Sequence, residues 1–255
     1  MPEFEINTIL FLAVVVLGTV VQTVTGFAIG LVTMAGVAVF GVADIAFAAM
    51  VISFISMANA LAALRKGYRH VEWPYVCWVL AGVVPAMIVG LVLLTYLSEH
   101  YYVVLKLILG TVIVLAGSML MIAPSPFEQR SRPTSAVACG VAGGLIAGLY
   151  SAGGAPIAYF MYRQPLAIDT IRFSLLATFA GITAARITMI TASGQLTMDV
   201  LKVSLIAVPL VIVVTLLSSK YLLDLPDRMV RVIVFLVLMG VGGFLMVDSA
   251  MDIMA

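Results

Sequence analysis

Two glycine-rich stretches interrupt apolar sequence and could hold an anion. The first spans residues 18–30 and the second residues 143–156. Adjacent glycines and a proline disfavour a continuous helix, and a helix that restarts after a break directs free N–H groups and its positive dipole end at the gap. The alternative for each glycine is close helix packing. The candidate binding residues in these stretches are Gln22, Thr25, Gly26, Phe27, Ser151, Gly153 and Gly154.

Arg186 is the one charge within residues 173–198. Its guanidinium stays protonated and offers five N–H donors to an oxyanion. Polar groups at membrane depth are costly and usually functional, so we expect Arg186 to contact a substrate anion. The alternative is a side chain that reaches the membrane interface and serves as an anchor.

Asn59 is a further candidate, because its amide needs several hydrogen-bond partners. It follows Ser53 and Ser56 at spacings of three, which predicts one shared helical face. The serines could equally bond back to their own helix. An internal repeat described below matches Asn59 to Thr183 or to the residues just after it, so we expect Asn59, Thr183 and Arg186 to face one cavity.

Catalysis is not supported by these residues. A nucleophile elbow around Ser151 would need glycine at the position of Leu149, and the only histidines, His70 and His100, lie in predicted loops on opposite sides of a membrane. No cluster of His, Cys or carboxylates suggests a catalytic metal, and no cofactor is expected. We therefore expect a protein that is not an enzyme; an intramembrane enzyme and an assembly protein remain the alternatives from other classes.

The elements that must position these residues are membrane helices. Of 255 residues, 64% are hydrophobic and 10% charged, against roughly 45–50% and about 25% in soluble domains. Most uncharged stretches reach the roughly 20 residues that a membrane-spanning helix needs. The balance of 13 basic and 12 acidic residues argues against a nucleic-acid partner. Stretches without charge are residues 6–43, 45–64, 73–98, 107–127, 133–162, 203–219 and 232–247.

The sequence repeats weakly about its middle. Three short matches recur at an offset of 124 or 125 residues, beginning at Val84 and Val208, at Tyr96 and Tyr221, and at Gly117 and Gly242. We therefore divide the chain into a first membrane repeat of residues 1–124, a cytoplasmic connecting loop of residues 125–132 and a second membrane repeat of residues 133–255. Internal duplication is common in secondary transporters, whose sites lie between the repeats.

Basic residues in the loops suggest the topology, because they mark the cytoplasmic side. Between the basic loops near Arg132 and Lys220 the chain must cross an even number of times, yet three apolar segments intervene. We predict an all-α fold of two inverted repeats, each with a re-entrant hairpin and three spanning helices, and with both termini outside. The hairpins are residues 6–43 and 133–162. The alternative is eight plain spans with parallel halves.

The chain resembles the TauE/SafE family of sulfite exporters over nearly its whole length. The resemblance rests on the two glycine-rich stretches, on the basic segment of residues 64–70 followed by Trp73, on the pattern from Arg172 through Arg186 to Leu196, and on residues 225–228. Thr183 departs from the family pattern, as does Ala28 in the first glycine motif. The resemblance implies transport of sulfite, sulfoacetate or other organosulfonates across the cell inner membrane.

Energetics agree with export of such anions. Each negative charge leaving a cell with a negative interior gains about 2.3 kcal/mol per 100 mV, and the apolar segments hold no deep Asp, Glu or His for a proton relay. The expected partners are a small anionic substrate and the lipid bilayer, with no nucleic acid, and a homodimer is left open. The alternative function is an ion-coupled carrier or importer of another small organic anion.

Overall fold

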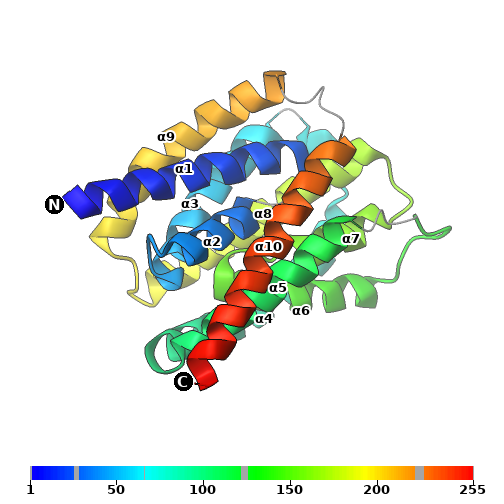
Figure 1. Cartoon of the computed structure of the whole chain (residues 1–255). Coiled ribbons are helices and arrows are strands. Elements are labelled where there is room, and N and C mark those ends of the chain that lie inside the picture. Colours follow the sequence, from blue (N-terminus) through cyan, green and yellow to red (C-terminus); the bar gives the residue numbers. More distant parts are fainter. Residues whose placement is uncertain (1, 26–28, 66, 122–125, 222–226, 255) are drawn as a thin grey trace.

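The computed structural model describes residues 2–25, 29–65, 67–121, 126–221 and 227–254, and these ranges consist of helices and connecting loops with no strand. Figure 1 shows a single bundle of helices. Their bounds are α1 Pro2–Thr25, α2 Ile29–Phe40, α3 Ile45–Leu64, η1 Tyr68–His70, α4 Trp73–His100, α5 Tyr102–Met121, α6 Pro133–Tyr150, α7 Gly154–Tyr162, α8 Ile168–Ala192, α9 Met198–Tyr221 and α10 Asp227–Met254.

Length and composition make this a polytopic membrane protein. Within the described residues, α3, α4, α5, α6, α8 and α9 are each long and apolar enough to cross a bilayer, and shorter apolar helices lie in α1, α2 and α10. Large apolar side chains such as Leu205 and Val92 stay exposed, as lipid-facing residues must be. The all-helical, multi-pass fold expected from the sequence is confirmed.

The second glycine-rich stretch interrupts a helix, as the sequence predicts. Helix α6 ends at Tyr150 and α7 begins at Gly154. Pro156 does not cause the break, because it lies in the first turn of α7, where a missing N–H costs nothing. The chain leaves the helix at Ser151, whose backbone is left-handed (φ 55°). In the first stretch α1 ends at Thr25 and α2 begins at Ile29.

The two ends of each broken segment lie near the same face of the bundle, and their assignment as re-entrant hairpins stays a prediction. The loop before α6 meets the end of α7, where Ser131 N donates to Gln164 Oε1 (3.0 Å) and Gln164 Nε2 donates to Ser131 Oγ (3.0 Å). At the opposite face Thr8 of α1, Ala43 after α2 and Asp199 of α9 line one surface hollow. Both chain ends lie toward that second face (Figure 1).

Helix contacts pair the two halves of the chain. Let each helix of α1–α5 exchange places with its counterpart in α6–α10, so that α1 exchanges with α6, α2 with α7, and so on. The contact of α1 with α9 then becomes that of α6 with α4, and the contact of α2 with α10 becomes that of α7 with α5. The pairs α3 with α8 and α5 with α10 map on to themselves. Helices α5 and α10 run antiparallel, since Lys106 pairs with Asp248 while Ser118 lies against Met239. This arrangement is the one expected of inverted repeats, and duplication itself stays a prediction.

Helices α4 and α6 run parallel and touch backbone to backbone. Gly140, Gly144 and Gly148 of α6 lie against the backbone of α4 near Val79, Val83 and Met87, respectively. A side-chain carbon at Gly144 would lie 2.5 Å from the Val83 carbonyl oxygen. Small residues spaced by four allow such close approach in membranes. This contact fixes α6, and with it the second break, against α4.

Candidate functional site

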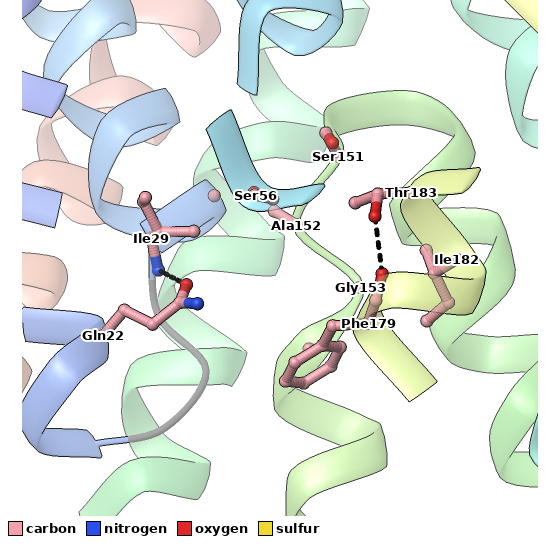
Figure 2. Close-up of a pocket in the computed structure, with 11 residues that line it drawn as sticks. Gln22, Ile29, Ser56, Ser151, Ala152, Gly153, Phe179, Ile182 and Thr183 are labelled. Carbon is pink, nitrogen blue, oxygen red and sulfur yellow. Dashed lines mark hydrogen bonds between the residues drawn. The ribbon is translucent and has the colours of Figure 1, made fainter. Parts of the chain in front are cut away.

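The two helix breaks meet at one small cavity, which we name the central cavity. Its volume is about 40 Å³. Because one water needs about 10–15 Å³ by this measure, the space admits about three oxygen-sized atoms. Figure 2 shows side chains from both breaks and from α3 and α8 around it. The lining residues are Gln22, Ile29, Gly30, Ser56, Ser151, Ala152, Gly153, Gly154, Phe179, Ile182 and Thr183.

Gln22 joins the two pieces of the first broken segment. Its side-chain Oε1 accepts a hydrogen bond from Ile29 N (3.1 Å), the first N–H of α2, and the side chain is 5% exposed (Figure 2). An amide in this position satisfies one of the N–H groups that a helix start leaves without a partner. The N-terminal end of α2, with its partial positive charge, therefore opens on the central cavity.

Ser151 is the turning point of the second broken segment. It is the one non-glycine residue with positive φ among the described residues, a conformation that costs about 1–3 kcal/mol and clusters at functional sites. Its hydroxyl lies 3.1 Å from that of Ser53 on α3. The strained serine therefore presents its side chain to α3 beside the central cavity.

Gly153 and Gly154 line the central cavity at the start of α7, but positive φ does not explain Gly153. Its φ is −70°, and an added side-chain carbon would lie 2.8 Å from the Ala147 Cβ of α6. Close packing between α7 and α6 requires glycine there. At the opposite wall, a side-chain carbon on Gly30 would lie 3.2 Å from the Ala152 Cα, so the starts of α2 and α7 approach each other closely.

Helix α8 supplies the wall facing both breaks. Thr183 lines the central cavity, with its hydroxyl donating to Phe179 O (2.8 Å) of the preceding turn (Figure 2). Ser56 of α3 also lines the cavity. From the sequence, Ser56 is mentioned but not selected as a binding residue, although its three-residue spacing from Ser53 is a signal for it. Phe179, Ile182 and Gly30 are not predicted from the sequence as lining residues.

Asn59 does not reach the central cavity, and the expectation that it shares one cavity with Arg186 is wrong. Its Oδ1 accepts a hydrogen bond from the Thr215 hydroxyl (2.9 Å) at the contact of α3 with α9, and Asn59 is 2% exposed. The pair satisfies polar groups between two buried helix surfaces. The side chain of Thr25, together with Gly26 and Phe27, lies outside the described residues, so these three candidates stay predictions.

Arg186 is fully buried but lines a neighbouring cavity instead of the central one. Its Nη1 donates to the carbonyl oxygens of Ala147 and Gly148 in the last turn of α6, while Nε and Nη2 have no hydrogen-bond partner. A cation at a helix C-terminus meets the negative end of the dipole. No carboxylate in the described part of the chain pairs with Arg186.

The groups that line the central cavity are suited to binding a small ligand. Its groups are hydroxyls, an amide and helix N-termini, and within the described residues no three His, Cys, Asp or Glu side chains gather to hold a metal. Apolar helices with two breaks that meet at one cavity are the arrangement typical of multi-pass membrane transporters.

Comparison with known proteins identifies the family. The chain belongs to the sulfite exporter TauE/SafE family, whose profile matches residues 10–245. It is similar to the probable sulfite/organosulfonate exporter TauE of Cupriavidus necator, with 34% identity over 232 residues that cover 91% of each chain. No solved structure matches the chain significantly. The family consists of membrane transporters, so the expectation that the protein is not an enzyme is confirmed.

Proposed function

We propose that this protein exports sulfite or a small organosulfonate such as sulfoacetate across the inner membrane, and that the oxyanion group of the substrate binds at the central cavity. The observation that carries the proposal is the convergence of two helix starts, α2 and α7, on one cavity lined by Gln22, Ser151 and Thr183. Helix N-termini bind oxyanions through free N–H groups. The resemblance to a named sulfite/organosulfonate exporter supports the same substrate class.

Neutral donors suit a carrier. A cage with several cations would hold a dianion too tightly for release, whereas hydroxyls, an amide and backbone N–H groups bind it reversibly. The substrate charge also supplies the direction, because each negative charge that leaves gains about 2.3 kcal/mol per 100 mV of interior-negative potential. Facilitated export needs no coupling ion. An ion-coupled importer of another organic anion is the competing proposal, and it predicts flux that depends on a sodium or proton gradient.

The proposal includes the topology. Two inverted halves, residues 1–124 and 133–255, would each contribute one re-entrant hairpin and three spanning helices. The hydrogen bonds of Ser131 with Gln164 support a second segment that enters and leaves on one side. The swapped helix contacts support the relation between the halves. Under this arrangement the basic segments near Arg130 and Arg69 face the cytoplasm.

The experiment measures ligand-dependent thermal stabilisation of purified protein, with sulfite, sulfoacetate, taurine and sulfate as probes. Gln22→Ala removes the cap of α2, and Ser151→Ala removes a cavity hydroxyl. Each lost hydrogen bond to a charged ligand should weaken binding by about 1.5–3 kcal/mol. Thr188→Val is the matched control, because its exposed hydroxyl bonds only to Ala184 O of its own helix.

Wild type and Thr188→Val should be stabilised equally by sulfite or sulfoacetate, and the two cavity variants much less. Labelled-anion flux in vesicles, measured with the same probes, then ranks the substrates. If Gln22→Ala and Ser151→Ala keep the full wild-type stabilisation, the breaks are packing features and the proposed site is wrong.

A further inference from the structure

Only one of the three guanidinium nitrogens of Arg186 has a hydrogen-bond partner. Its Nη1 contacts two carbonyl oxygens at the end of α6, yet Nε and Nη2 are buried without a partner. A residue needed only to cap α6 would require no such unpaired donors, and burying them destabilises the protein unless water or a ligand accepts them. Arginine presents these nitrogens as a planar fork that matches two oxygens of an oxyanion.

The fork borders a second cavity, which we name the Arg186 cavity. Its volume is about 110 Å³, larger than that of the central cavity. Thr95 and Ser98 of α4 and Gln195 after α8 supply its polar wall, and all three are half-buried. Gln195 Nε2 donates to Thr95 Oγ1 (3.1 Å), which holds the end of α8 against α4. Met50 and Leu94 are among the apolar residues opposite.

The two cavities follow one another along α3 and α8. Helix α8 offers Phe179 and Thr183 to the central cavity and Arg186 and Ile190 to the Arg186 cavity. These sets are seven residues apart, which is about 10 Å along a helix. On α3, Ser53 lies between Ser56 of the first cavity and Met50 of the second, and its contact with Ser151 (3.1 Å between hydroxyl oxygens) stands between them.

We propose that the Arg186 cavity is a second anion site, toward the face that holds both chain ends, and that it receives the substrate oxyanion from the central cavity when the Ser53–Ser151 contact opens. The inference rests on the proposed function and deepens it. Arg186 binds through Nε and Nη2, and the second Nε2–H of Gln195 completes the site, while the Ser98 hydroxyl donates to Thr95 O (3.0 Å). Its position toward the face that holds both chain ends makes it the last site that the anion occupies before it leaves.

The test compares the two faces of the protein. Labelled sulfite added to right-side-out membrane vesicles reaches the outer face, and sulfite added to inside-out vesicles reaches the cytoplasmic face. Gln195→Glu puts a negative charge in the Arg186 cavity, and Thr95→Val removes the hydroxyl that holds Gln195. Gln22→Ala changes the central cavity, and Thr188→Val changes neither. Melting temperatures show that each variant is folded.

Gln195→Glu should raise the half-saturating sulfite concentration at the outer face about tenfold, the factor typical of losing a hydrogen bond to a charged ligand, and leave the cytoplasmic value within about twofold. Thr95→Val should act in the same direction, and Gln22→Ala should raise both values. A Gln195→Glu variant with an unchanged outer-face value, or with equal changes at both faces, overturns the second site alone. Wild-type vesicles that take up neither sulfite nor sulfoacetate overturn the proposed function, and the second site with it.

Discussion

At the scale of the single residue, Arg186 combines a structural and a binding role in one side chain. One edge of its guanidinium caps α6 and the other edge is unpaired. A lysine ammonium carries the same charge, but it lacks the planar fork and cannot serve both edges at once. The geometry of the group, and not only its charge, should therefore matter for transport.

We expect Arg186→Lys to reduce sulfite flux about tenfold or more, and Arg186→Ala to nearly abolish it, because each loses charge-assisted hydrogen bonds of about 1.5–3 kcal/mol. Labelled-sulfite uptake into vesicles measures both effects, with protein amount and melting temperature recorded for each variant. Arg172→Ala, a change near the start of the same helix, should have a smaller effect. A folded Arg186→Ala protein with normal flux would reduce Arg186 to an anchor.

The sequence predicted where helices break, but it did not predict which way Asn59 points, because that depends on the rotation of its helix. Helices end and restart within both glycine-rich stretches, and Gln22 and Ser151 line one cavity there. Asn59 was assigned to the face of Ser53 by two spacings of three. Each such step falls about 60° short of a full turn, so Asn59 points about 120° away from Ser53, toward Thr215. The spacing alone gives this rotation, but only the placement of α9 shows that Thr215 is what Asn59 then meets.

At the scale of the element, the two broken segments are held differently. Helix α6 contacts α4 through glycine backbones on both sides, including Gly82 and Gly140. Its counterpart, α1, packs on α9, which contains no glycine. Side chains separate that pair, so the second broken segment should be the more rigidly attached of the two.

We expect Gly144→Ala to destabilise the protein by about 1–3 kcal/mol, since the added carbon overlaps Val83 of α4 and forces the helices apart. Gly243→Ala in α10 is the control, because no atom lies within 4 Å of the added carbon; it should be neutral or stabilise by up to about 1 kcal/mol through helix propensity. Thermal denaturation in detergent measures both. Equal melting temperatures for the two variants would contradict a tight α4–α6 contact.

At the scale of the whole molecule, the two faces of the bundle differ in the loops, chain ends and ion pairs that lie on them. One face holds the loop before α6, the end of α7 and the ion pair of Arg130 with Glu72 (2.9 Å). The other holds both chain ends and the ion pair of Lys106 with Asp248. Counting basic loops predicts that the first of these faces is cytoplasmic and that both termini lie outside, and this topology stays a prediction.

We expect reporter domains fused to either terminus to be located outside the cytoplasm, since both ends lie toward the face opposite the basic loops. A pair of reporters that report inside and outside activity measures this directly. A reporter inserted near Arg130, in the loop before α6, should give the cytoplasmic signal and serves as the control. A cytoplasmic C-terminus would exclude the inverted arrangement and restore eight plain spans.

The unpaired nitrogens of Arg186 also have a kinetic consequence. A buried donor without a partner costs about 1–3 kcal/mol, so the protein is least stable when it is empty and closed. A carrier that reorients passes through this closed state, so the cost adds to the barrier of the empty carrier. A bound anion removes this cost, and about 1.4 kcal/mol in a barrier is a tenfold change in rate. The loaded carrier should therefore reorient about tenfold faster than the empty one. Sulfite–sulfite counterflow should outrun net efflux by that factor in the wild type, and equal rates would show that the empty carrier bears no such penalty.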